Sequence, residues 1–315
     1  MIKKLFFTAA LLVPGLAYGA DPSANLPIQI VPAAAVPAAA QAAGFNTLII
    51  NDNFQDPSFA NPATWYDCAG ASSPLYWRAW VGFGTNIDGP CSAITQATDP
   101  LTGQSALRIH WQDSYFSGLG SGHAFGTMIQ TAADNGVGRL VPPGFYIEVV
   151  ARTDLLNVSG SMDLWSLTPT AGDYEIDGLE EFGSAGSMQS NIHNPWASGG
   201  AFNNCARCVS CPPQGCGFDL TQYHTYAWRQ TSGGTDKVFC AYYDGVLAGC
   251  QTIMPNSTQL AGFPMLHQVG SYATNGGRPI GNGNTGKNTW IKSVKVWSCA
   301  GLNSGAQCNS SSNNP

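Results

Sequence analysis

Charge is scarce in this sequence of 315 residues, and positive charge is the scarcer kind. There are 13 Lys and Arg residues against 19 Asp and Glu residues, which gives a formal net charge of −6 at pH 7. Nucleic acids and anionic membrane surfaces attract clusters of basic residues. The composition therefore argues against both as partners.

Long apolar runs and periodic repeats are also missing. No stretch approaches the ~20 consecutive apolar residues that a membrane-spanning helix needs, and the longest N-terminal run, residues 5–16, is too short. The sequence has no heptad pattern and no internal repeat, so it predicts neither a coiled coil nor a solenoid.

The N-terminus has the pattern of an export signal. Lys3 and Lys4 precede the apolar run, and Ala17-Tyr18-Gly19 after it is a small-x-small site that a signal peptidase could cut. We therefore expect a mature chain that starts near Ala20. We expect it to be secreted or periplasmic and to act as a monomer without membrane contact.

Turn-forming residues are abundant, with 37 Gly and 20 Pro. From Asn46 onward they separate short β-like runs at a spacing of roughly ten residues, which is typical of a sandwich or barrel. The Pro/Ala-rich segment before Asn46 is predicted to be a linker, or a short helix after Pro37. The predicted organisation is a signal peptide at 1–20, a linker at 21–45, one all-β domain at 46–300, and a Ser/Asn-rich tail at 301–315. Strands are expected at 47–54, 106–111, 145–152, 188–196 and 290–297.

Ten cysteines in an exported chain are expected to form disulfides. Cys240 and Cys250 flank a turn. A three-residue turn centred on Gly245 would place them opposite each other, whereas a two-residue turn at Asp244-Gly245 would put them out of phase. Four more cysteines within 205–216 have a spacing that also occurs in zinc and iron–sulfur sites, but export favours two local disulfides there.

Acidic residues are concentrated in one stretch, where four carboxylates fall within residues 175–181. In a strand, Glu175 and Asp177 point to one face and Ile176 to the other. A one-residue β-bulge at Gly178-Leu179 would bring Glu180 onto the face of the first two acids, and a glycine there lowers the cost of the irregular backbone. The sequence therefore predicts three carboxylates on one strand face.

Retaining glycoside hydrolysis requires such a set, because one carboxylate attacks the sugar and a second carboxyl group protonates the leaving oxygen. The Cα atoms of Glu175 and Glu180 would lie roughly 13 Å apart, so both long side chains must lean inward toward the roughly 5 Å gap of retaining enzymes. Repulsion among neighbouring carboxylates favours a proton on one of them. The alternatives are a solvated acidic strand and a calcium-binding loop.

The segment Glu175-Ile176-Asp177-Gly178-Leu179-Glu180 resembles the Glu-x-Asp-x-x-Glu signature of glycoside hydrolase family 16, in the bulged form of its laminarinases, agarases and carrageenases. The resemblance implies a concanavalin A-like jelly roll of two antiparallel sheets with a concave substrate groove. It also implies that Glu175 is the nucleophile, Asp177 its hydrogen-bonding modulator and Glu180 the acid/base, with Glu181 outside the motif.

Four further residues are candidate substrate contacts. Segment 76–88 resembles a family segment whose Asn meets the sugar, which makes Asn86 a candidate, although an ordinary turn residue is the alternative. Trp165 stands at a family Trp position and could stack on a pyranose, or belong to the core. Asn191 and His193 alternate on a polar strand after the acids, and His193 takes the place of a family His near the acid/base.

Segments 223–228 and 237–246 resemble the His-Thr-Tyr-Ala strand and the Tyr-Val-Asp-Gly hairpin of the family. Trp228 comes two residues before the Trp of the family pattern, and Gln230 stands where that Trp would be. Trp228 is therefore expected to have a different orientation.

The resemblance implies a secreted, endo-acting β-glycosidase, with laminarin-type β-1,3-glucan as the leading substrate. Agarose or another neutral β-galactan is an alternative, whereas a sulfated carrageenan would need a basic groove that this composition does not offer. A non-catalytic, lectin-like sandwich is the rival of another class. No cofactor or metal is predicted, although some family members bind a structural calcium and no dense run of oxygen ligands indicates one here.

Overall fold

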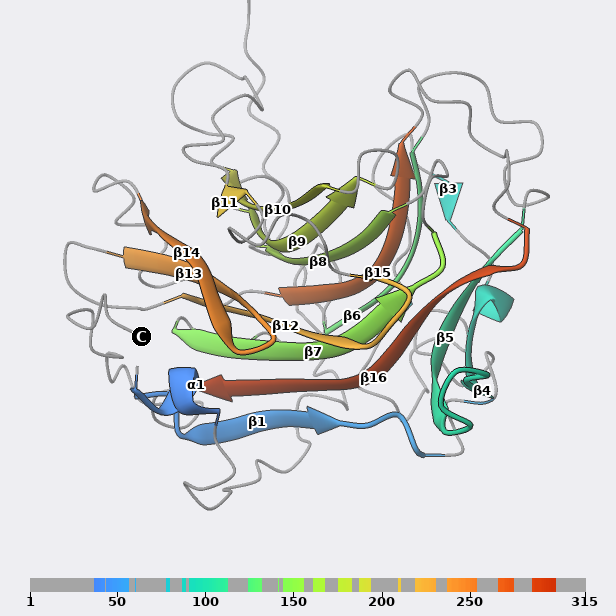
Figure 1. The fold of residues 1–315 in the computed structure, drawn as a ribbon, viewed down its shortest axis with the longest axis horizontal. Coiled ribbons are helices and arrows are strands. Elements are labelled where there is room, and N and C mark those ends of the chain that lie inside the picture. The colour runs from blue at the N-terminus through green and yellow to red at the C-terminus, as the bar shows by residue number, and fades with distance from the viewer. Residues whose placement is uncertain are drawn as a thin grey trace, which may run out of the picture.

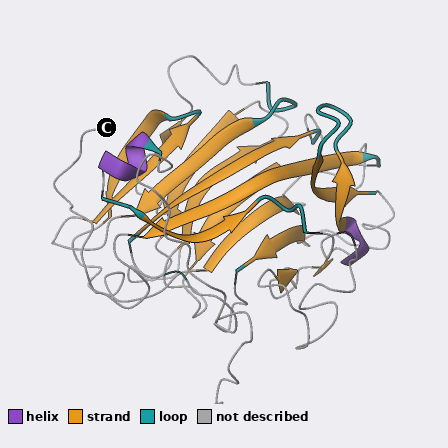
Figure 2. Ribbon diagram, turned by 90° about the horizontal axis from the view of Figure 1, so that it is seen from below, coloured by secondary structure: helices purple, strands orange, loops and turns teal. Residues whose placement is uncertain are grey.

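The computed structural model describes residues 37–42, 44–56, 60, 78–79, 87–88, 91–112, 124–131, 141, 144–155, 161–167, 175–182, 187–193, 209–210, 219–230, 237–253, 266–274 and 285–298. Strands make up nearly all of its regular structure, and short helical segments lie at the margins (Figure 2). The elements are α1 (Ala38–Ala42), β1 (Thr47–Asp52), β2 (Arg78–Ala79), β3 (Ile87–Asp88), η5 (Cys91–Ala93), β4 (Ile94–Thr98), β5 (Ser105–Trp111), β6 (Ala124–Gln130), β7 (Phe145–Thr153), β8 (Ser161–Leu167), β9 (Glu175–Phe182), β10 (Ser187–His193), β11 (Val209–Ser210), β12 (His224–Gln230), β13 (Lys237–Tyr243), β14 (Val246–Ile253), β15 (Leu266–Thr274) and β16 (Lys287–Ser298).

The described strands form two sheets of eight (Figure 1). The first sheet has the order β14-β13-β12-β7-β16-β5-β4, and β1 also pairs with β16. The second has the order β11-β10-β9-β8-β15-β6-β2, and β3 also pairs with β6. All of these pairs are antiparallel except β3 with β6. The predicted all-β, jelly-roll sandwich is confirmed, and the acidic segment lies within the second sheet.

The core lies between the sheets, and strand alternation in β7 shows how the sequence builds it. Phe145, Ile147, Val149 and Ala151 are fully buried members of one cluster that also takes in side chains of the second sheet. The intervening Tyr146 belongs to a separate cluster on the other face. Successive side chains of a strand point to opposite faces, so the single strand β7 supplies both.

The second cluster covers the outer face of the first sheet. Short helix α1 follows Pro37, and Ala40 and Phe45 are buried beside Tyr146 and Trp297. The ring centroids of Tyr146 and Trp297 are 5.7 Å apart in an edge-to-face arrangement. The chain just before β1 therefore packs on the sandwich with a short helix after Pro37, whereas residues 21–36 of the predicted linker lie outside the described residues.

The β13–β14 hairpin has a two-residue turn and not the three-residue turn that would by itself place Cys240 opposite Cys250. Tyr243 pairs with Val246, so the turn has two residues, and both adopt positive φ, 50° at Asp244 and 76° at Gly245. Such a turn matches the twist of a hairpin. The register then shifts between Ala241 and Tyr242, because a bulge adds a residue to β14.

This bulge restores the phase that the two-residue turn would otherwise lose. Cys240 lies directly opposite Cys250. The expectation that a two-residue turn would put Cys240 and Cys250 out of phase is therefore wrong. The turn is one residue shorter than the three-residue turn that would align them, and the extra residue in β14 makes up the difference.

Within the described ranges, the structure contains no helix long and apolar enough to cross a membrane.

Candidate active site

The acidic strand β9 contains a β-bulge beside β8. Leu164 pairs with Leu179, but the next residue of β8, Trp165, pairs with Asp177. Gly178 is therefore the extra residue on β9. Glycine suits this position because it tolerates irregular backbone conformations and needs no space for a side chain.

The neighbour on the other side, β10, gives the same result. Gln189 pairs with Glu180, and Asn191 pairs with Asp177. Between these pairs β9 has two residues, Gly178 and Leu179, where β10 has one. Both ladders thus confirm the bulge predicted from the sequence.

The bulge sets the phase of the acidic positions. Ile176 and Leu179 are fully buried in the core between the sheets, although they are three residues apart. By strand alternation, positions 175, 177 and 180 have the opposite phase. The register therefore brings the three candidate catalytic positions, Glu175, Asp177 and Glu180, into one phase on the outer face of the second sheet.

The Asp177 side chain is fully buried, with 0% exposure. Burying a carboxylate costs free energy unless its surroundings compensate for the lost hydration. Buried acids therefore usually have a polar or charged partner. This burial distinguishes Asp177 from a solvated surface acid and fits a residue with a fixed position in a site.

Trp165 lies across from Asp177 and outside the core. On β8, Met162 and Leu164 enter the core between the sheets. Ser166 accepts a hydrogen bond there from the indole of Trp228 on the first sheet. Trp165 has the opposite phase, belongs to neither apolar cluster and is 8% exposed. Its position on β8 therefore has the phase that points away from the cluster between the sheets. The indole lies on the outer face, beside the acidic strand.

The polar strand β10 aligns its candidates with the acids. Asn191 pairs with Asp177, and His193 pairs with Glu175, the predicted nucleophile. Gln189 is the residue across from Glu180, which His193 was expected to accompany. Asn86, the fourth candidate contact, lies outside the described residues.

The register also identifies a row of positions that the sequence analysis missed. Trp165 pairs with Gln268 on β15, Gln268 with Gln130 on β6, and Gln130 with Arg78 on β2. The row runs from Asp177 across the outer face of the second sheet. The sequence signal for this row is the alternation of polar residues within 124–130 and 266–274. It is weak, because apolar and small residues interrupt the polar ones.

Metal ligands do not gather in the described part of the chain. No group of three or more His, Cys, Asp or Glu side chains there is arranged to hold an ion.

Comparison with known proteins gives no match by sequence and many by structure. No protein-family model matches the chain, and no curated protein sequence matches it. Among solved structures, a laminarinase from Flavobacterium sp. UMI-01 has a TM-score of 0.54 at 16% identity, over 80% of this chain and 100% of that one.

Two further structures share the architecture. SCLam, a non-specific endo-β-1,3(4)-glucanase from family GH16, has a TM-score of 0.53 at 14% identity, over 80% of this chain and 91% of that one. A GlcNAcα1-4Gal-releasing endo-β-galactosidase from Clostridium perfringens has a TM-score of 0.52 at 16% identity, over 81% of this chain and 63% of that one. The chain therefore has the β-sandwich fold of glycoside hydrolase family 16.

Proposed function

We propose that this protein is an endo-acting, retaining β-glycosidase that hydrolyses a polysaccharide. The observation that carries the proposal is the bulge at Gly178, which both neighbouring ladders place between Asp177 and Glu180. It puts three acidic positions in one phase, and a sheet built only for stability gains nothing from like charges on one face. The fold shared with endo-β-glucanases and an endo-β-galactosidase supports the same conclusion.

Each acid has a distinct role in this proposal. Glu175 attacks the anomeric carbon and forms a glycosyl-enzyme, while Glu180 protonates the departing oxygen. Glu180 then removes a proton from the water that releases the sugar. Asp177 lies between them in the sequence and is buried, and it orients the nucleophile by hydrogen bonding.

Four residues are proposed to bind the sugar chain. Trp165 offers an aromatic face beside Asp177, where an indole can stack on a pyranose. Asn191 and His193 stand opposite Asp177 and Glu175 on β10 and supply hydrogen bonds. Asn86 is retained from the sequence resemblance alone.

The proposed substrate is a β-1,3-glucan of the laminarin type. The laminarinase and the endo-β-1,3(4)-glucanase that share the fold support this choice. A neutral β-galactan is the second candidate, because an endo-β-galactosidase shares the fold as well. A net charge of −6 argues against a sulfated galactan, since a polyanion is bound by basic side chains.

We further propose that the protein acts outside the cytoplasm, as the N-terminal signal pattern indicates, and that it acts as a monomer. Polymers such as laminarin are too large to enter a cell intact, so the enzyme must meet them after export.

Chemical rescue with azide tests the proposed function and the roles together. In Glu175→Ala, azide can attack directly from the face that the nucleophile has vacated and give a glycosyl azide of inverted configuration. In Glu180→Ala, an aryl glycoside with an activated leaving group still forms the glycosyl-enzyme, and azide opens it with net retention.

The wild-type chain is first incubated with laminarin, mixed-linkage glucan, agarose and carrageenan, and the products are sized. Glycan binding without any new reducing ends would support a lectin and refute the hydrolase. Activity on carrageenan alone would refute the charge argument. Two azides of the same configuration would refute the assignment of roles.

A further inference from the structure

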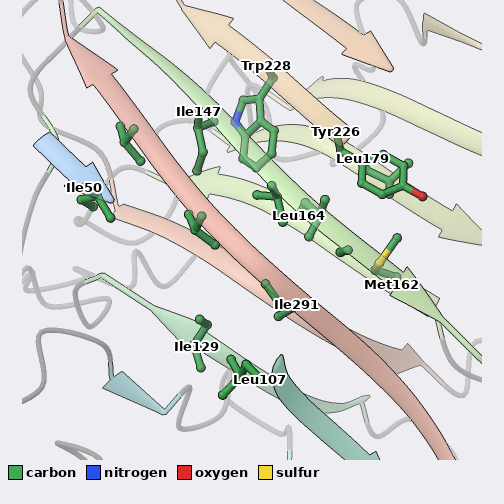
Figure 3. Close-up of a cluster of buried hydrophobic side chains, with 14 of the residues drawn as sticks. Ile50, Leu107, Ile129, Ile147, Met162, Leu164, Leu179, Tyr226, Trp228 and Ile291 are labelled. Atoms are coloured by element: carbon green, nitrogen blue, oxygen red, sulfur yellow. The ribbon is translucent and has the colours of Figure 1, made fainter. Parts of the chain in front are cut away.

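The bulge at Gly178 rests on the indole of Trp228, which β12 brings from the opposite sheet. A Cβ added to Gly178 would lie closer than 3.0 Å to Cδ2, Cε3 and Cε2 of that indole, a separation that real Cβ atoms do not show. Trp228 is fully buried in the core, and Figure 3 shows its ring reaching into the cluster that holds Leu164 and Leu179. The indole thus occupies the space that a side chain at position 178 would need.

The same ring is tied to the strand beside the acids. Its Nε1 donates a hydrogen bond of 2.8 Å to Oγ of Ser166 on β8, and both groups are buried. Ser166 pairs with Ile176 of β9 and directly follows Trp165. Because a buried N–H without an acceptor is costly, this bond holds the ring plane in one orientation.

Backbone pairing does not by itself select which residue of β9 is the extra one, because every residue of the strand can form the same backbone hydrogen bonds. Within Glu175–Phe182, Gly178 is the single residue without a Cβ. A bulge displaced along the strand would bring a residue with a Cβ beneath the indole. Loss of the bulge would exchange the phases of Leu179 and Glu180, moving the apolar residue out of the core and the acid toward it.

We propose that Trp228 is a positioning residue for the catalytic strand. By filling the space above Gly178 and bonding to Ser166, it holds the extra residue at position 178 and so keeps Glu180 in phase with Glu175 and Asp177. The inference rests on the proposed function, since it assigns Trp228 to the geometry of that same site.

The test compares two reactions that depend differently on Glu180. Cleavage of laminarin needs an acid and then a base. Cleavage of 2,4-dinitrophenyl β-laminaribioside in the presence of azide needs neither, because the leaving group departs unprotonated and azide attacks as an anion. Trp228→Leu is expected to lower kcat on laminarin by about 100-fold, the loss typical of a small misplacement. Its KM and its azide-assisted rate should stay within about threefold of wild type.

Trp297→Leu is the matched control. It removes an equally buried indole from the outer face of the first sheet, where no contact with β9 is at stake. Both variants are assayed at a temperature at which circular dichroism shows them folded. A merely structural role for Trp228 would lower both reactions together, as in Trp297→Leu, and that result would overturn the proposal.

A compensating pair gives a second measure. Gly178→Ala should lose about as much laminarin activity as Trp228→Leu, since a methyl group there pushes against the indole. Adding Trp228→Leu to Gly178→Ala should raise kcat at least about tenfold over Gly178→Ala alone if the clash is the cause. Additive losses in the double variant would contradict the proposal.

Amide hydrogen exchange separates this inference from the proposed function. Residues 176–181 should exchange faster in Trp228→Leu than in Trp297→Leu, whether or not the wild type cleaves laminarin. A wild type inactive on every glycan, with faster exchange in Trp228→Leu, would refute the function and support the bulge-holding role. Unchanged exchange would refute the role of Trp228.

Discussion

Trp165 and Asp177 lie directly opposite each other on neighbouring strands, and both stand in the phase that faces away from the core. An indole in this place can form the floor beneath a sugar that meets the acids. Trp165→Ala should therefore raise KM for the polysaccharide about two- to tenfold, which corresponds to the roughly 0.5–1.5 kcal/mol of an aromatic contact. Trp165→Phe should retain part of the affinity. Initial rates over a range of laminarin concentrations measure both, and a fall in kcat at unchanged KM would contradict a stacking role.

The phase of β9 predicts opposite results for two adjacent glutamates. Glu180→Ala should lower kcat by about 10²–10⁴-fold, the range for loss of a general acid and base. Glu181 has the other phase and pairs with Met188, so Glu181→Ala should keep most of the activity. Reducing-end assays on laminarin compare them. If Glu181→Ala were the inactive variant, the bulge would be misassigned by one residue.

The buried ion pair of Arg152 and Asp99 predicts a stability that depends on pH. Nε and Nη2 of Arg152 donate to Asp99 at 3.2 and 2.5 Å, and the two side chains are 4% and 0% exposed. Burial opposes ionisation of Asp99, but hydrogen bonds from Arg152 and the Leu101 backbone outweigh it, so the pKa of Asp99 lies below its ordinary value. Asp99→Asn should cost about 3–5 kcal/mol at pH 7, because it leaves a buried guanidinium with only the partly exposed Asp154 as its counter-charge.

The sign of the pH effect follows from the lowered pKa. The contribution of Asp99 is fully present above the ordinary aspartate pKa of about 3.9 and is lost as pH falls through the lower, folded value. The difference between wild type and Asp99→Asn should therefore shrink below about pH 4 in urea unfolding. Asp154→Asn is the control, since Asp154 is 31% exposed and its bridge to Arg152 is worth about 0–1 kcal/mol. An equal difference at pH 7 and pH 3 would contradict the assignment.

The turn at Asp244-Gly245 predicts a conformational cost at one residue. Gly245 has φ of 76°, a left-handed conformation, so Gly245→Ala should lower the free energy of unfolding by about 1–2 kcal/mol. Val246, the next residue in the chain, is exposed. Val246→Ala should therefore change the free energy of unfolding by less than about 0.5 kcal/mol. Equal effects in thermal unfolding would rule out the backbone explanation.

Asp244 ties the same turn to β12. Its carboxylate accepts from the Thr225 backbone N–H at 2.8 Å and lies 2.7 Å from Nδ1 of His224. Asp244→Gly keeps the positive φ but removes both contacts, and should cost about 0.5–1.5 kcal/mol for the hydrogen bond lost at this exposed site. Asp244→Asn, which can still accept from Thr225, should fall between the two in urea unfolding.

The register of the hairpin predicts a disulfide between Cys240 and Cys250. Directly opposite residues of antiparallel strands are close enough to be bridged, and the export that we propose would favour the bond. Peptide mapping under non-reducing conditions should find these two cysteines linked. Deleting Ala248, which lies where β14 has its extra residue, should put them out of phase and abolish the link. A link that survives the deletion would show that the bulge does not set their alignment.

The predictable parts of the fold were those governed by local pattern. The bulge in β9 could be predicted because a glycine interrupts the alternation at one place and only one insertion restores the phase of the acids. Strands β5, β7 and β16 could be predicted because alternating apolar residues mark one buried face. In each case the deciding information lies within ten residues.

The parts that could not be predicted depend on contacts between distant segments. The bulge in β14 compensates for a short turn, and whether it forms depends on which residues of β13 and β14 pair, although Gly249 stands beside the extra residue. The sequence predicts a different orientation for Trp228 from that of the family Trp, but its contact with Gly178 depends on how the two sheets stack. The row Gln268, Gln130 and Arg78 needs the strand order of the second sheet.

The docking of Phe45 and α1 has a consequence for where the chain can be cut. A chain begun at Asn46 would uncover Tyr146, Tyr242 and Trp297 at once, and a contiguous aromatic surface of this kind makes a soluble protein adhere to itself or to other surfaces. A chain begun at Pro37 keeps α1 and Phe45 on that face. Trimming a few residues further would turn the outer side of the first sheet into an adhesive one while leaving the acidic strand intact.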